Sequence, residues 1–472
     1  MNFGKGIFHV VCNKKSRPVR LKIIIFTFFL FMLLWLAPGS LTTWENISIC
    51  IFVYFFLDFL ELLGKRIVIL EFTNIMAALT CLLMPVIFYH QYTHENPLAR
   101  LWVKYMPVSS DDYFSFMVPA VISLALGLRV PLSKSIAKKD PKIYMEDMKR
   151  RLQIKAPVGL ALIAVGAVSG LLDIYAPSSL KEFFYLMANL TYVGVFYVIY
   201  SPGKHKRIVV PSVIILMIAQ SLATGMFGEL IFLTSCALVL ILLGKEIAFG
   251  RKILIALIGI FLIVLIQSVK VEYRQKSWTQ GTGADPVYFG ELIVDRVTDP
   301  ATMIEPNILF FTAVRINQGW LVANTMKKVP EKFDFAYGET IWQSVAASIV
   351  PRFLWPEKPN AGGKANLKRF WGFNLVGFSM NIGPFGEAYA NFDKLGGIIY
   401  MFFYGLFFNF MLTQILIFSS KRPTIVLWLP FLFYYSISVE TDLLTTMSSL
   451  LKGLFFTWLV FQAFYITMRK DL

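Results

Sequence analysis

The chain has 472 residues, of which 57% are hydrophobic and only 16% are charged, and its mean hydropathy is +0.63. This composition excludes a soluble protein of ordinary make-up. The formal net charge of +16 would suit a nucleic-acid-binding protein, but the basic residues lie mostly in short loops at alternate ends of apolar runs. The positive-inside rule gives this placement in membrane proteins. We therefore expect a membrane protein with no nucleic-acid partner.

Apolar runs of about 18–20 residues recur along the chain, and a helix of that length crosses the roughly 30 Å hydrocarbon core of a bilayer. They predict an all-α polytopic membrane protein with about twelve transmembrane helices. The first run has no small-residue cleavage site, so we expect it to be retained. The predicted spans cover residues 23–41, 47–63, 67–89, 113–132, 157–175, 183–200, 208–224, 227–243, 253–269, 397–419, 424–438 and 453–468.

The loops between these spans predict the topology. With the amino terminus in the cytoplasm, the internal segments carry about 26 Lys and Arg against about 5 Asp and Glu. Both termini are then cytoplasmic. The longest internal loop, 133–156, is expected to lie along anionic lipid headgroups, which makes membrane lipids a partner.

One segment, 270–396, differs from the rest. Its apolar runs are shorter, and it mixes about 14 basic with about 12 acidic residues. We expect a large helical extracytoplasmic cap here, between membrane-domain parts 1–269 and 397–472. Candidate helices in the cap cover 286–297, 307–328 and 339–350, the last of them stopped by Pro351.

The densest cluster of chemically useful residues runs from Gly338 to Gly397. Prolines at 351, 356 and 359 stiffen the path on which Arg352 and Lys358 flank Trp355. Cations mounted beside an aromatic face suit a phosphorylated lipid or sugar, because arginine matches phosphate oxygens and tryptophan stacks on sugar rings. The alternative is that these residues anchor the cap at the headgroup level. Further cations follow at Lys364, Lys368 and Arg369.

Two charged residues stand alone in apolar surroundings. Arg315 lies within an apolar helix, where a charge faces either a polar cavity or a counter-charge. Glu387 lies between glycines and aromatic residues just before the tenth span. Desolvation there would make it a useful general base, although a helix-start carboxylate is the simpler alternative.

Other patterns are weaker. His90 and His94 have metal-like spacing but no third ligand, and Ser109 to Asp112 fits a helix cap better than a metal-binding acidic pair. The four cysteines, Cys12, Cys50, Cys81 and Cys236, have no metal-ligand spacing. We expect neither a metal nor a cofactor. Carboxylates in or near the spans keep a transporter possible: Asp58, Glu61, Glu71, Asp173 and Glu229.

At this cluster the chain resembles the O-antigen polymerase (Wzy) family of bacterial oligosaccharide repeat-unit polymerases. The resemblance covers about 80–100 residues, and the rest agrees in hydropathy and in the large loop before the last three spans. The matching features are Arg315, Gly338-Glu339, Pro351-Arg352-x-x-Trp355-Pro356-x-Lys358-Pro359 and Gly386-Glu387-x-Tyr389-x-Asn391-Phe392 with Gly396-Gly397.

The resemblance implies a metal-independent glycosyltransferase of the bacterial inner membrane, with a fold similar to the membrane (GT-C-like) glycosyltransferases. A growing glycan on undecaprenyl pyrophosphate would move to a new lipid-linked unit, making O-antigen, capsule or exopolysaccharide. A flippase and a chain-length regulator would be its pathway partners. Implied roles are a base at Glu387 or Glu339, pyrophosphate binding by Arg315, Arg352, Lys358 and Arg369, and sugar binding by Trp355, Tyr389 and Asn391.

Two other functions agree with the sequence. A lipid-glycan ligase, or another polyprenyl-dependent glycosyltransferase, would use the same chemistry with a different acceptor. A polysaccharide flippase or secondary transporter would also have about twelve spans, but transporters usually show two similar halves with interrupted helices. The chain shows no such symmetry.

Overall fold

The computed structural model describes residues 17–36, 39, 41–133, 141–153, 156–173, 175–177, 180–225, 227–276, 285–352, 354–374 and 380–468. Cys12 and, within the predicted basic loop 133–156, residues 134–140 and 154–155 lie outside these residues. Within the described residues the regular structure is helical, and none of them forms a strand. This confirms the all-α class.

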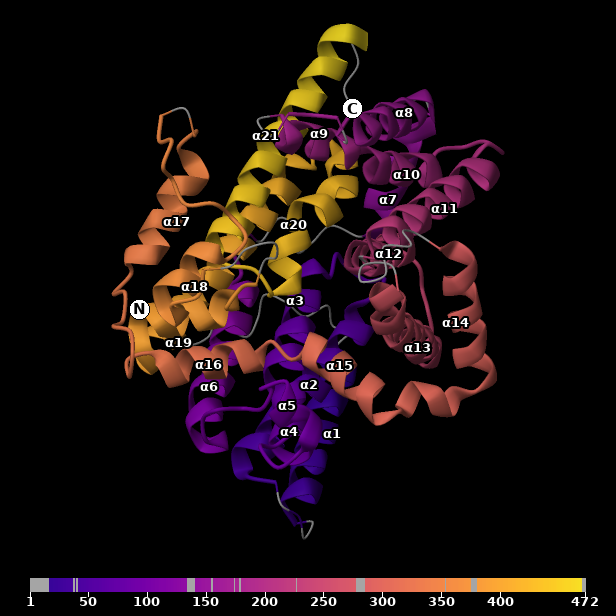
Figure 1. Ribbon diagram of the computed structural model, residues 1–472. Helices are drawn as coiled ribbons and strands as arrows, with labels where there is room; N and C mark the ends of the chain where they lie inside the picture. Colours follow the sequence, from indigo (N-terminus) through magenta and orange to yellow (C-terminus); the bar gives the residue numbers. More distant parts are fainter. Residues whose placement is uncertain are drawn as a thin grey trace, which may run out of the picture.

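Figure 1 labels most of the helices. In this view α1, α2 and α4–α6 lie in the lower part and α7–α12 lie towards the upper right, and the second half of the chain adds the predicted cap and the last spans. Their bounds are α1 (Arg17–Leu36), α2 (Thr43–Leu62), α3 (Ile69–Ala78), the π-helix η1 (Leu79–Leu83), α4 (Met84–Gln91), α5 (Pro97–Leu101), α6 (Ser110–Arg129), α7 (Pro141–Gln153), α8 (Ala156–Asp173), α9 (Lys181–Ala188), α10 (Leu190–Tyr200), α11 (Lys206–Thr224), α12 (Gly228–Leu242), α13 (Phe249–Arg274), α14 (Pro286–Thr298), the 3₁₀ helix η4 (Pro300–Ile304), α15 (Pro306–Ile316), α16 (Gly319–Lys328), α17 (Glu339–Ile349), α18 (Lys364–Trp371), α19 (Gly383–Phe418), the 3₁₀ helix η5 (Pro423–Trp428), α20 (Leu429–Ser438) and α21 (Leu443–Met468).

The long apolar helices are those of a membrane protein. In the described part of the chain, eight helices are long and apolar enough to span a bilayer, and a pair bent by 80° at 145–152 and 157–173 would make nine. The other three predicted spans correspond to α2, which carries three carboxylates, and to two shorter apolar segments, 230–242 and 423–438. A count of twelve therefore stays a prediction.

Helix α2 has an ionic network at each end. At its start, Glu45 caps the helix and also contacts His90 at 3.1 Å and Ser110 at 2.7 Å. At its other end, Asp58 pairs with Arg20 at 3.2 Å and with Arg129 at 2.8 Å. The start of α1 and the ends of α2 and α6 thus lie together, which is the helix polarity that alternating spans require.

A close crossing of α6 and α19 fixes the position of α19. An added Cβ at Gly127 would lie 2.1 Å from the carbonyl oxygen of Phe402, and one at Gly405 would lie 2.5 Å from that of Leu124. Glycine at both positions lets the backbones approach, as small residues do between membrane helices. The Asn409 side chain adds an interhelical hydrogen bond to the Val130 carbonyl at 2.8 Å.

The predicted cap is helical, but its helices differ in part from those expected. Helices α14 and α17 confirm the candidates at 286–297 and 339–350. The candidate at 307–328 was wrong as a single helix: the chain leaves helical geometry at Asn317, whose side-chain oxygen accepts from the Trp320 N–H at 3.1 Å and starts α16.

The tenth predicted span begins earlier than expected. Helix α19 starts at Gly383, not at residue 397, and its backbone breaks at Asp393, where φ is 57° and ψ is −168°. The break separates a short first part, which carries Glu387, from the long apolar part. The first part packs among α16, α17 and α18 of the predicted cap.

Candidate active site

Glu387 is the most deeply buried carboxylate among the predicted site residues, with 0% of it exposed. The Asn366 side chain of α18 donates from Nδ2 to one carboxylate oxygen at 3.2 Å. The backbone N–H of Leu443, the first residue of α21, donates to the other at 2.8 Å. Both donors are neutral, and among the described residues no cation pairs with Glu387. Such a group is costly to the fold and typical of a functional site.

Asn391 lies one turn after Glu387 and joins α19 to α17. Its Nδ2 donates to the carbonyl oxygen of Glu387 at 2.8 Å and to the Thr340 hydroxyl at 2.7 Å. Its Oδ1 accepts from the Gly338 N–H at 3.2 Å. Both the oxygen and the nitrogen of the Asn391 side-chain amide are therefore used in hydrogen bonds within the protein. Tyr389 is also a core residue, with its ring edge-on to Phe116 at 5.4 Å.

The turn 439–442, between α20 and α21, links Glu387 to Arg315 together with Leu443, the residue that follows it. Val439 has φ of 55°, in the left-handed region that β-branched residues rarely adopt, and such strain clusters at functional sites. Glu440 accepts from the Arg315 guanidinium at 2.9 Å. Asp442 is 2% exposed and accepts from the Thr445 N–H at 3.0 Å. Burial raises the pKa of the Asp442 carboxyl above its ordinary value.

Further cations lie near Arg315. Lys270 of α13 is only 7% exposed and lies within electrostatic range of Arg274, Arg315 and Glu440. The Arg274 guanidinium donates to the Gly225 carbonyl at 2.7 Å. We call Lys270, Arg274 and Arg315 the cation cluster. With three cations and the single carboxylate of Glu440, these four residues carry a local positive excess.

The family model that matches residues 116–418 is described as a domain of unknown function, DUF8712. The chain belongs to the DUF8712 family. No curated protein and no solved structure matches it. The DUF8712 region begins within α6 and ends with α19, so it contains Glu387, Asn391 and the cation cluster. The turn 439–442 lies beyond it.

Two predicted phosphate-binding residues of the DUF8712 region are engaged by their own loop. Arg352 is exposed and donates to the Pro356 carbonyl at 3.1 Å and to the Asn360 side chain at 2.8 Å. Lys358 donates to the carbonyls of Ala347 and Val350, both at 2.8 Å, which caps the end of α17. Burial, with smaller contributions from Lys452 and Arg352, lowers the pKa of Lys358.

The remaining predicted residues of this region lie away from the Glu387 carboxylate contacts. Glu339 is exposed at the start of α17 and accepts from the Gln343 side chain at 3.1 Å. Arg369 lies over the Phe370 ring at 5.4 Å. Trp355 is partly buried, and its backbone N–H donates to the Pro351 carbonyl at 3.2 Å.

Four further candidates outside the DUF8712 region, two carboxylates and two histidines, have structural partners. Glu61 and Glu71 pair with Lys65 and Arg66. His90 contacts Glu45, and the His94 ring stacks edge-on to Tyr105 at 5.1 Å. Ser109 accepts from the Asp112 N–H at 3.1 Å, which confirms it as the cap of α6. Over the described residues no three His, Cys, Asp or Glu side chains gather to hold a metal.

Sequence reasoning missed the residues that complete the site: Asn366, Glu440, Asp442, Lys270 and Arg274. One signal was available for the acids, since Glu440 and Asp442 are the only acidic residues between the predicted spans 424–438 and 453–468. The spacing of residues in the sequence does not show that this segment contacts Glu387, because the hydrogen bond from Leu443 to Glu387 joins residues 56 positions apart.

Proposed function

We propose that this DUF8712 protein is a glycosyltransferase of the bacterial inner membrane that polymerises polyprenyl-pyrophosphate-linked oligosaccharide units. The motif order of the cap supports this proposal through its resemblance to the O-antigen polymerases. The observation that carries it is the segment 440–443, in which Leu443 donates to a buried carboxylate without a cation partner among the described residues and Glu440 contacts the cation cluster. A base and a phosphate-binding group are the two functions that this reaction needs.

In the proposed reaction, a hydroxyl at the non-reducing end of the new unit attacks the anomeric carbon of the growing glycan. The bond from that carbon to the pyrophosphate oxygen breaks, and the polyprenyl pyrophosphate leaves with the electron pair. The hydroxyl proton passes to the Glu387 carboxylate. Because Glu387 has only neutral donors, its charge is not cancelled by a neighbouring cation, which favours proton uptake.

The cation cluster is the better pyrophosphate site of the two that the chain offers. Arg315 pairs with Glu440, and Lys270 on a different helix lies within electrostatic range of both, so a pyrophosphate arriving there would meet cations from two helices. Arg352 and Lys358 donate instead to carbonyls of the loop and of α17. We propose that they hold the cap in shape and that their effect on the donor is indirect.

Deletion of the gene in its host tests the proposal. A polymerase deletion should remove long-chain polysaccharide while single repeat units still reach the cell surface. Accumulation of long chains on the polyprenyl carrier, with none transferred to the final acceptor, would show a ligase. Accumulation of single repeat units on the cytoplasmic side would show a flippase.

A transporter remains the second candidate because of one observation. Glu387 in α19 and Asp442 in the turn before α21 are both nearly inaccessible in a membrane protein, as proton-carrying carboxylates are. Transport of a lipid-linked glycan coupled to protons would depend on a pH gradient. Polymerisation by purified protein in detergent needs no gradient, so that reaction separates the two functions.

A further inference from the structure

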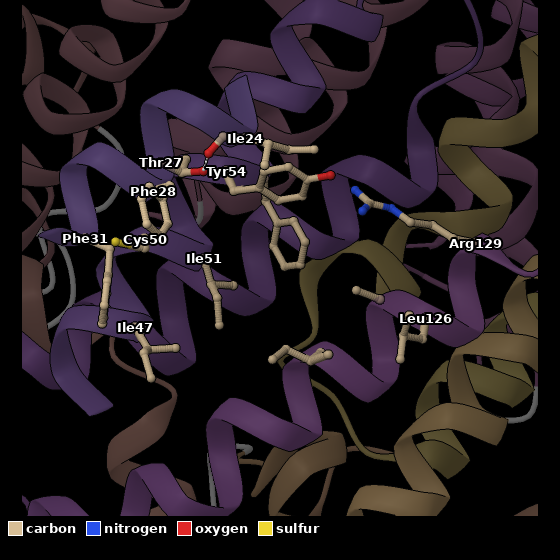
Figure 2. A pocket seen from close by; sticks show the side chains of 13 residues that line it. Ile24, Thr27, Phe28, Phe31, Ile47, Cys50, Ile51, Tyr54, Leu126 and Arg129 are labelled. Carbon is tan, nitrogen blue, oxygen red and sulfur yellow. Dashed lines mark hydrogen bonds between the residues drawn. The ribbon is translucent and has the colours of Figure 1, made fainter. Parts of the chain in front are cut away.

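A groove lies between α1, α2 and α6, on the side of α2 that faces the first helix. Its volume is about 440 Å³, within the usual range of small-molecule sites, ~300–1,000 Å³. Figure 2 shows Ile24, Phe28, Ile47, Ile51 and Leu126 along its walls, with Arg129 at one end. An apolar groove between membrane helices, with a cation at one end, suits a lipid, which has an apolar chain and a charged headgroup.

The charged end of this groove has a positive excess. Arg129 and Arg20 both pair with the buried Asp58, at 2.8 Å and 3.2 Å, so these three residues carry two positive charges and one negative charge. Asp58 uses only part of the Arg129 guanidinium, which has five N–H donors. The guanidinium also lies 5.3 Å from the Phe55 ring centre and lines the groove. A phosphate could accept from it without displacing Asp58.

The charged end lies far from the candidate active site. Asp112, at the start of α6, contacts Lys394 of α19 at 3.3 Å, just beyond the part of α19 that carries Glu387. Arg129 is the last residue of α6, 17 positions later, which corresponds to about 26 Å along the helix. That distance approaches the thickness of the hydrocarbon core, ~30 Å. A headgroup at Arg129 is therefore in the other leaflet from the candidate active site that contains Glu387.

We propose that this groove binds one acyl chain of an anionic phospholipid, with the lipid phosphate on Arg129 and Arg20. The apolar walls fit the chain, and the excess positive charge fits an anionic headgroup, as in basic pockets between membrane helices. The position of the cations excludes the polyprenyl donor as the occupant. This site is separate from the proposed polymerase reaction and does not depend on it.

Native mass spectrometry of the purified full-length protein with added phosphatidylglycerol or phosphatidylcholine tests the site. The unaltered protein should retain phosphatidylglycerol more strongly. Arg129→Gln should weaken phosphatidylglycerol binding by about tenfold, since a charge-assisted hydrogen bond is lost while glutamine still donates to Asp58. Leu126→Trp keeps both arginines and places a larger ring in the groove from an exposed position, so it should lower retention of both lipids.

Arg207→Gln is the matched control, because Arg207 is an exposed arginine in the first turn of α11 and does not line the groove. It should bind both lipids as the unaltered protein does. Equal retention of the two lipids by the unaltered protein would overturn the proposal, as would unchanged phosphatidylglycerol binding in both groove variants. Displacement of phosphatidylglycerol by an equal concentration of polyprenyl phosphate, dependent on Arg129, would overturn the choice of occupant.

Discussion

Replacing Glu387 by glutamine separates its chemistry from its structural contacts. The amide oxygen can still accept from the Leu443 N–H, and the amide nitrogen can donate to Asn366 once the Asn366 amide turns over. We expect the stability of Glu387→Gln to change by at most about 1 kcal/mol. Glu387→Ala leaves two buried donors without an acceptor, at roughly 1–3 kcal/mol each.

The rate should respond in a different way from the stability. If Glu387 takes the acceptor proton, Glu387→Gln should lower the elongation rate by about 10²–10⁴, while the donor still binds. The assay is the initial rate of glycan elongation by purified protein with a labelled lipid-linked donor, together with donor binding and thermal unfolding. Glu331→Gln is the control, since Glu331 is an exposed carboxylate of the predicted cap that pairs with Lys327. Elongation by Glu387→Gln at the rate of the unaltered protein would refute the assignment.

Three further predictions concern the donor, the fold and the topology. Arg315→Gln should raise the donor KM by about 10–100-fold with a smaller effect on thermal unfolding, because a charge-assisted phosphate contact is lost; an unchanged KM would remove Arg315 from the donor site. Gly127→Ala should destabilise the protein by about 1–3 kcal/mol through overpacking, whereas Gly259→Ala, where an added Cβ meets nothing within 4 Å, should not; equal melting temperatures would contradict the close crossing. A cysteine at Asn360 should react with an impermeant reagent in intact cells and one at Lys142 should not, and the reverse pattern would overturn the predicted sides of the membrane.

The sequence predicts the helical class well because hydropathy reports burial in lipid directly. Runs such as 249–274 and 443–468 stand out by length and composition alone. Shorter or more charged segments are harder. Helix α2 carries Asp58, whose charge is balanced by Arg20 and Arg129 from two other helices. A pairing between distant helices leaves no periodic pattern.

The site could be predicted only in its local part. Glu387 was chosen because a carboxylate among glycines and aromatic residues is unusual, and its complete burial agrees with that reasoning. The roles of Arg352 and Lys358 were inferred from charge and stiffness, but a cation beside prolines serves equally well to bind the carbonyls at the end of α17. Spacing cannot distinguish these uses, because both place a cation on a rigid loop.

The irregularities of the backbone could not be predicted from the sequence either. The irregularities are the π-helix at 79–83, the break at Asp393 and the left-handed Val439. Neither Asp393 nor Val439 is a glycine, and no proline lies next to either of them. At Val439 the cause is tertiary: Glu440 and Leu443, which follow it closely, are held by Arg315 and Glu387. Such conformations are consequences of the fold and have no local signature.

Polymerisation by the purified protein is the most direct test of the proposed function. The full chain in detergent would be mixed with a single lipid-linked repeat unit from its host, without nucleotide sugars and without a membrane potential. We predict a ladder of longer lipid-linked glycans, with free polyprenyl pyrophosphate released at each step. If the repeat unit stays unextended although the protein is folded and the repeat unit is the host's own, the protein is not the polymerase.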